Sequence, residues 1–306
     1  MTPLRLSRAC AVAALACVVA FNPVLAQRTY RPGPIAVQRT GPKHLLYRVT
    51  GAHGATVYLL GSVHLLTAEA GRLPPEVDTA FAHAKTIAFE TSLDTVMLRA
   101  PELLARGRYA NGATLRSSLS PAGIAALDTV LPAYGLTVDQ MNGFKPWFVS
   151  MVLSQLVMQR SNFQAQYGVE IQLNARAHDA GKTIIGLEPV DVQLGLFDSI
   201  SPADQERMLL DGGMPDSASR ELLRIKDAWL AGDAERIDSI MNRRTPGSAN
   251  LVATLVTRRT LSWMPAILGL LAGKDDALVV VGAGHIVGSQ GIVALLRAKG
   301  YAVEQL

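Results

Sequence analysis

Apolar residues gather in short runs near both ends of the chain, whereas the middle carries them at helical spacing. Apolar and alternating runs predict strands over residues 44–50, 55–61, 85–91, 182–187, 277–281 and 301–305. Between the first two runs lies Gly51-Ala52-His53-Gly54, a sequence rich in turn formers. The pattern therefore predicts a hairpin with a four-residue loop.

Elsewhere in the chain, apolar residues recur at the spacing typical of an amphipathic helix. This spacing predicts helices over residues 73–84, 146–160, 168–180, 217–231, 233–242, 248–271 and 288–299. Ser120-Pro121 and Ser201-Pro202 start two more, because serine is a good N-cap and proline is tolerated in the first turn. The expected fold is α/β: a single domain over 43–306, whose mixed β-sheet is formed by both chain ends, with a large helical insert at about 92–270.

The first residues are typical of a secretory signal. Arg5 and Arg8 precede an apolar stretch, residues 9–20, and Val24-Leu25-Ala26 supplies small residues suited to a signal peptidase. We therefore expect residues 1–26 to be a signal peptide cleaved near Ala26, and the protein to be periplasmic or secreted. Residues 27–42 lack apolar periodicity and predict a flexible N-terminal segment.

Composition after this signal excludes several classes of protein. Both cysteines, Cys10 and Cys17, lie in the signal, so the mature chain has no disulfide and no thiolate. Without the two signal arginines, 27 of the 29 Lys and Arg residues remain against 25 Asp and Glu, and this near-neutral balance argues against a nucleic-acid partner. No later apolar run is long and unbroken enough to span a bilayer, so we expect no stable membrane insertion after signal cleavage.

Two G-x-x-H stretches follow apolar strands. They are Gly61-Ser62-Val63-His64 and Gly282-Ala283-Gly284-His285. In α/β sheets ligands bind at the C-terminal ends of strands. Glycine there lets the backbone approach a ligand, so Gly61, Gly282 and Gly284 are candidate substrate-binding positions, and each histidine is placed to enter the same crevice.

Glu90 ends the predicted strand TIAFE, and a carboxylate after such a run is costly to bury unless it is paired or ligated. Two imidazoles, His64 and His285, together with Glu90 make a plausible divalent-metal site that activates a bound water. The alternative is that both histidines are packed, hydrogen-bonded residues at strand ends.

These stretches, together with residues 168–189 and 282–306, resemble the TraB/GumN family over almost the whole mature chain. The family has two G-x-x-H motifs and a glutamate, which correspond to His64, His285 and Glu90. The resemblance implies an α/β hydrolase-like fold. Through the related Tiki proteins it also implies a metallopeptidase that uses manganese or cobalt.

The resemblance extends to Arg259 and Trp263, which match a family R-N-x-x-W pattern, with Thr260 where asparagine is usual. Arg259 either binds a substrate carboxylate or pairs with Glu90 or Glu188. These two roles remain open.

Two further glutamates have alternative roles. Glu188 either orients a ligand histidine, as carboxylates around metal sites do, or is a carboxylate at a helix N-terminus. Glu170 lies in the first turn of a predicted helix, where interaction with the helix dipole is the favoured interpretation.

The leading hypothesis is therefore a periplasmic metal-dependent hydrolase, a Tiki-like metallopeptidase acting on a peptide or small-molecule substrate through metal-bound water. His64, Glu90 and His285 would be both the metal ligands and the catalytic residues, with Glu90 either a ligand or the general base. The alternative is a non-enzymatic periplasmic binding protein for a peptide, haem or signalling molecule.

Overall fold

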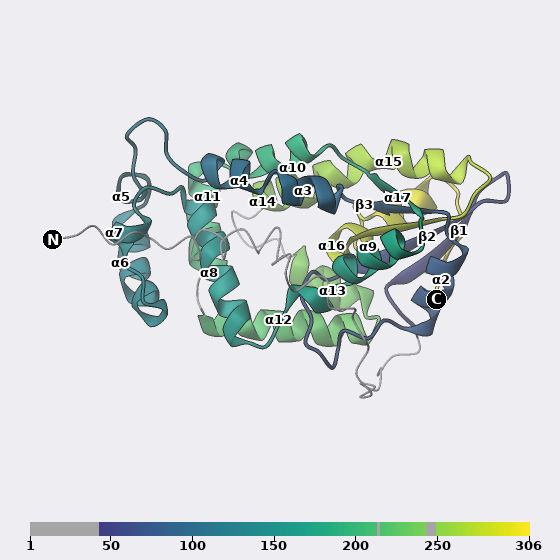
Figure 1. Ribbon diagram of the computed structural model, residues 1–306, viewed down its shortest axis with the longest axis horizontal. Helices are drawn as coiled ribbons and strands as arrows, with labels where there is room; N and C mark the ends of the chain where they lie inside the picture. Colours follow the sequence, from purple (N-terminus) through teal and green to yellow (C-terminus); the bar gives the residue numbers. More distant parts are fainter. Residues whose placement is uncertain (1–42, 213–214, 243–248) are drawn as a thin grey trace. The chain divides into compact units, whose positions relative to one another are not determined.

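A computed structural model of the chain describes residues 43–212, 215–242 and 249–306 (Figure 1). The predicted signal peptide, 1–26, and the predicted flexible segment, 27–42, lie outside these residues. The chain divides into two compact units. One contains Asp94–Asn162 and Leu194–Glu221, and the other contains the described residues before Asp94, together with Phe163–Gln193 and Leu222–Leu306.

The second unit holds a six-stranded mixed sheet of order β4-β3-β5-β2-β1-β6. The strands are β1 (Leu46–Thr50), β2 (Thr56–Ser62), β3 (Thr86–Phe89), β4 (Thr183–Gly186), β5 (Ala277–Gly282) and β6 (Val303–Gln305). Neighbouring strands from β4 to β2 are parallel, whereas β1 runs antiparallel to both β2 and β6. The chain before the predicted insert supplies β1, β2 and β3, and the chain after it supplies β5 and β6, so the two chain ends form five adjacent strands.

The sheet-bearing unit also contains helices, several of which lie beside the strands (Figure 1). They are α2 (Pro75–His83), α9 (Val169–Asp179), α13 (Ala234–Met241), α14 (Ala249–Val252), α15 (Arg258–Leu271), α16 (Ala283–Ile286) and α17 (Ile292–Ala298), with the 3₁₀ turn η2 (Ala165–Tyr167) and the π-helical turn η4 (Ala253–Thr257).

The regular secondary structure described in the other unit is helical, apart from an isolated β-bridge between Arg108 and Phe144. This unit contains α4 (Ala100–Arg106), α5 (Leu115–Ser118), α6 (Pro121–Val130), α7 (Val138–Met141), α8 (Pro146–Arg160) and α11 (Pro202–Gly212), with the turns η1 (Leu131–Tyr134) and η3 (Phe197–Ser199). Three helices cross a boundary between the units, namely α3 (Leu93–Leu98), α10 (Val190–Leu196) and α12 (Pro215–Leu230). Ser120 caps α6 by accepting from the Gly123 N–H, as the sequence predicted.

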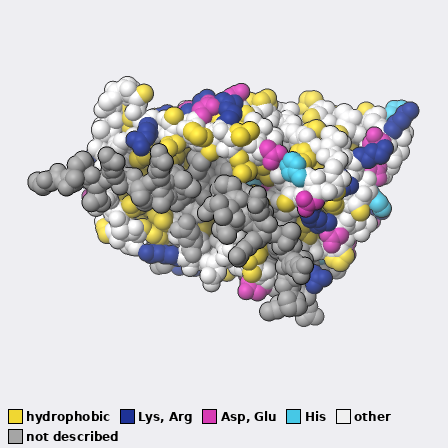
Figure 2. All heavy atoms as spheres, viewed as in Figure 1, with side chains coloured by type: hydrophobic (Ala, Val, Ile, Leu, Met, Phe, Trp, Pro, Cys, Tyr) yellow, Lys and Arg dark blue, Asp and Glu magenta, His cyan; other side chains and the backbone are white. Residues whose placement is uncertain are grey.

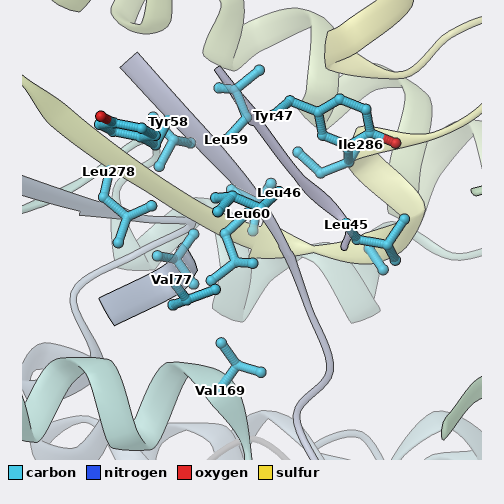
Figure 3. Close-up of a cluster of buried hydrophobic side chains, with 14 of the residues drawn as sticks. Leu45, Leu46, Tyr47, Tyr58, Leu59, Leu60, Val77, Val169, Leu278 and Ile286 are labelled. Carbon is cyan, nitrogen blue, oxygen red and sulfur yellow. The ribbon is translucent and has the colours of Figure 1, made fainter. Parts of the chain in front are cut away.

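The core of the sheet-bearing unit forms on both faces of the sheet. Successive strand residues point to opposite faces, so Leu60 lies on the side of Val77 and Val169, and Leu59 lies on the other side with Ile286 (Figure 3). The central strand β5 is buried along its whole length. Burial on both faces explains why its sequence is continuously apolar rather than alternating.

The α/β class and the mixed sheet are confirmed, and three details differ from the predictions. The sheet is not formed by the chain ends alone, because the predicted strand 182–187, which lies within the insert 92–270, is β4 and pairs with β3 at the edge of the sheet. The hairpin loop has five residues, 51–55, since Thr50 pairs with Thr56. The last predicted helix, 288–299, is shorter than predicted, because Gly288 adopts a positive φ of 77° and α17 starts only at Ile292, after the separate short helix α16. The single-domain boundaries stay a prediction.

Among the residues described, no helix is both long and apolar enough to cross a membrane. On the face shown in Figure 2, Lys and Arg side chains are interspersed with Asp and Glu. The absence of a nucleic-acid partner remains a prediction.

Candidate functional site

Sheet order brings the two G-x-x-H stretches and Glu90 to one edge. Strands β2 and β5 are parallel neighbours with Ser62 opposite Gly282, so His64 and His285 each follow the end of a neighbouring strand. Strand β3 lies on the other side of β5 with Phe89 opposite Val280, which places Glu90 next to Gly282. The C-terminal ends of parallel strands meet at a common edge, and this explains why residues more than 190 positions apart form one cluster.

His64 is anchored by Glu170. The Glu170 carboxylate accepts from His64 Nδ1 at 2.8 Å through its Oε1 atom, and the buried Ser62 hydroxyl donates to the same oxygen. The His64 side chain is 66% exposed, whereas that of Glu170 is 8% exposed. The imidazole therefore faces solvent while its anchor is buried.

The negative charge of Glu170 determines the protonation of His64. It raises the His64 pKa from 6.5 to about 9, against the opposing effect of desolvation, and the hydrogen bond between the two side chains adds to the rise. At neutral pH the ring is therefore an imidazolium.

His285 has the opposite environment. Burial lowers its pKa to about 4, so the ring is neutral at pH 7. The Thr260 hydroxyl lies 2.8 Å from Nδ1 and donates its one proton to the Val256 carbonyl at 2.9 Å. The hydroxyl must then accept from an Nδ1–H, so Nε2 of His285 carries the lone pair of the ring, 3.5 Å from Nη1 of Arg259. Trp263 packs against the ring with centroids 4.5 Å apart.

Arg259 lies between two buried carboxylates. Its Nη2 atom is 2.6 Å from Glu90 Oε2 and 2.6 Å from Glu188 Oε1, and its Nε donates to Glu188 at 3.1 Å. Trp263 Nε1 donates to the other oxygen of Glu188 at 3.0 Å. Glu188 thus orients the arginine and the tryptophan rather than a histidine, and the geometry favours the pairing role of Arg259 over capture of a substrate carboxylate.

Glu90 is ionised in this setting. Burial alone would raise its pKa, but the positive charges of a protonated His285, of the Arg259 guanidinium and of His64, together with the Gly282 N–H, lower it to about 2. Because His285 is neutral at pH 7, the carboxylate is stabilised there by Arg259, which contacts it at 2.6 Å, and by the more distant charge of His64.

The π-helical turn before α15 helps to place these side chains. A π-turn adds a residue to the helix and shifts the phase of the residues that follow. Carbonyls of this turn are taken by side chains of the next turn: Leu255 accepts from Arg259 at 3.3 Å and Val256 accepts from Thr260. The wide turn thereby fixes both functional side chains.

The predicted substrate-binding glycines have structural partners within the protein. The Gly282 N–H donates to Glu90 at 2.8 Å, the Gly61 carbonyl accepts from Trp229 Nε1 at 2.8 Å, and the Gly284 carbonyl accepts from Asn242 at 3.0 Å. A Cβ at Gly61 would lie 3.2 Å from the Ala283 backbone. Glycine there permits β2 and the start of α16 to approach one another, and contact with a substrate stays a prediction.

The donor set suits a divalent cation. His64 and His285 are both held through Nδ1, and Glu90 supplies an oxygen. Nε2 of the neutral His285 ring has a lone pair, whereas Nε2 of the His64 imidazolium gains one only when a cation displaces its proton. Glu90 Oε1 is 3.9 Å from His285 Nε2, and the close group of Glu90, Glu188 and Arg259 carries one net negative charge. However, Arg259 Nη1 lies 3.5 Å from His285 Nε2, so a cation would share this space with the guanidinium. Across the described ranges, no three His, Cys, Asp or Glu side chains are gathered as a ready metal site.

Sequence reasoning missed the main role of Glu170. It assigned this residue to the dipole of α9, whereas the side chain holds His64 and Ser62. No local pattern signals this pairing, because Glu170 is 108 positions away from Ser62. The position of Glu170 at the start of a helix already accounts for a glutamate at this site, so the sequence gives no reason to look for a distant partner.

Comparison with known proteins agrees with the motifs. A profile of the TraB/PrgY/gumN family matches residues 45–305. The chain is 23% identical over 245 residues to the uncharacterized protein YbaP of Escherichia coli (strain K12), covering 78% of this chain and 87% of that protein, and the same values hold for YbaP of Shigella flexneri. No solved structure matches the chain.

Proposed function

We propose that this chain, which belongs to the TraB/PrgY/gumN family, is a metal-dependent hydrolase of the periplasm that cleaves peptides or small-molecule substrates. The observation that supports it most is the pair of histidines held through Nδ1 beside an ionised carboxylate. His64, His285 and Glu90 would hold the cation, with manganese or cobalt the expected metals. The signal-like residues 1–26 support the periplasmic location.

A bound divalent cation would supply Lewis acidity, polarising a substrate carbonyl and lowering the pKa of a water molecule. The residues of the chain prepare the site for this. Thr260 keeps the lone pair of His285 on Nε2, and Glu170 holds the ring of His64. Arg259 keeps Glu90 ionised.

The low pKa of Glu90, about 2, bears on its role. An efficient general base has a pKa near the working pH, because a much weaker base gives little driving force for proton removal. We therefore assign Glu90 as a ligand rather than the base.

The direct test uses the mature protein, stripped with a chelator and then assayed for peptide cleavage with and without Mn²⁺ or Co²⁺. His64→Ala and His285→Ala should abolish metal-dependent turnover. His53→Ala is the control, because His53 lies in the exposed β1–β2 loop. Turnover that survives both site variants, or that needs no metal, would contradict the proposal.

A non-enzymatic binding role is the second candidate. It is favoured by the ion pairs of Arg259, which neutralise Glu90 within the protein itself and leave a complete network without a cation. The His285→Ala variant separates the two functions. An enzyme should retain substrate affinity and lose turnover, whereas a binding protein should lose affinity.

A further inference from the structure

The start of α9 is docked against the backbone of the His64 loop. The Val169 N–H donates to the Val63 carbonyl at 3.2 Å. At Gly168 a Cβ atom would overlap the His64 carbonyl oxygen, so only glycine permits this approach. The first turn of α9 is thereby brought to within reach of the His64 ring.

Glu170 stands in this turn and makes a restricted set of contacts. Its Oε1 atom accepts from both Ser62 and His64, and its Oε2 atom is buried with no hydrogen-bond partner among the described residues. The negative charge is therefore directed at the side chains of Ser62 and His64.

Burial of this carboxylate is not explained by the helix dipole. A carboxylate that served only the N-terminus of α9 would gain the same interaction at the surface without losing its hydration. Glu170 is instead 6% exposed, and its charged partner is a histidine whose own side chain is open to solvent. The contact that compensates for the burial is the one with His64.

We propose that Glu170 is a positioning residue that fixes the ring of His64 by holding its Nδ1 proton, so that Nε2 is the nitrogen that releases its proton and binds a cation. This inference rests on the proposed function in one respect, namely that the ligand is a divalent cation. Carboxylates in this position orient the ring and increase its donor strength, and their loss weakens metal binding by about 10- to 100-fold.

The test compares Glu170→Ala, Glu170→Gln and the wild-type mature protein. Titration calorimetry with Mn²⁺ measures affinity, and NMR of the His64 ring measures the Nδ1 proton, which a carboxylate partner shifts far downfield. Glu170→Ala should weaken Mn²⁺ binding by about 10- to 100-fold and remove the downfield signal. Glu170→Gln keeps an acceptor oxygen but no charge, so it should retain the proton signal at a less extreme shift with a smaller loss of affinity.

A matched control is Glu76→Ala, which removes the carboxylate 3.1 Å from His44 in the same unit. It should leave both measurements unchanged. The inference is overturned if Glu170→Ala lowers only the thermal midpoint while the His64 signal and Mn²⁺ affinity stay as in the wild type. If Glu170→Ala does not fold, a Glu170→Gln signal identical to the wild type overturns it. A wild-type protein that binds no Mn²⁺ would refute the metal proposal, and the NMR measurement alone would then decide the role of Glu170.

Discussion

Removing the charge of Arg259 is the sharpest perturbation of this site. In Arg259→Met the chain keeps a side chain of similar length but leaves Glu90 and Glu188 without their shared cation. The side chains of Arg259, Glu90 and Glu188 are 10%, 12% and 3% exposed. Little water can therefore replace the lost hydrogen bonds.

The loss of stability expected for Arg259→Met follows from the burial of these charges. Removing one partner of a buried ion pair costs about 3–5 kcal/mol, because the remaining charge is left uncompensated. Large chains lose about 2 °C in Tm per kcal/mol, so we expect Tm to fall by roughly 6–10 °C. Exposed pairs contribute at most about 1 kcal/mol. Arg106→Met is therefore a suitable control, since Arg106 is 34% exposed and pairs with Glu102 and Asp198.

The pH dependence provides a second signature. The folded pKa of Glu90, about 2, lies below the ordinary 4.5, so its contribution to stability is present above pH 4.5 and is lost as pH falls through about 2. Without Arg259 this contribution is smaller at neutral pH, because the ion pair with Glu90 is lost. The stability gap between wild type and Arg259→Met should therefore be largest near pH 7 and should shrink between pH 4.5 and pH 2.

Urea denaturation at pH 7 and pH 3 measures this gap as the change in unfolding free energy at a constant m-value. The reasoning is refuted if Arg259→Met costs no more than Arg106→Met. It is equally refuted if the gap is the same at both pH values.

Three further outcomes are expected. Gly168→Ala should displace the loop that carries His64, because the added Cβ meets the carbonyl oxygen of His64. The expected result is a lower thermal midpoint together with an altered NMR signal of the His64 ring. An unchanged His64 signal would contradict the displacement. Thr260→Val should cost about 1–3 kcal/mol, because the Nδ1–H of buried His285 loses its acceptor; chemical denaturation checks this, and a cost near zero would contradict the assigned tautomer. The ion pair of His64 with Glu170 should stabilise the fold fully below pH 6.5, and this stabilisation should be lost as pH rises through about 9. An NMR titration should therefore find His64 protonated at pH 7.5. A His64 titration midpoint near pH 6.5 would contradict this expectation.

Much of the local structure was determined by the sequence. The apolar helix predicted over 146–160 is α8, Pro146–Arg160, and the apolar run 277–281 lies within β5. Such patterns succeed because burial of one helix face or of a whole strand leaves a direct record in the spacing of apolar residues. The two G-x-x-H stretches and Glu90 were placed at strand ends by the same reasoning.

Only the tertiary structure decided which groups meet. The order of the strands made β5 the neighbour of both β2 and β3, and thereby set His64, His285 and Glu90 at one edge. The tertiary structure also brings Glu170 into contact with His64 and places Arg259 between the carboxylates of Glu90 and Glu188. Periodicity reports that a residue is buried but not what it is buried against, since partners far apart in sequence are selected by sheet order and helix docking.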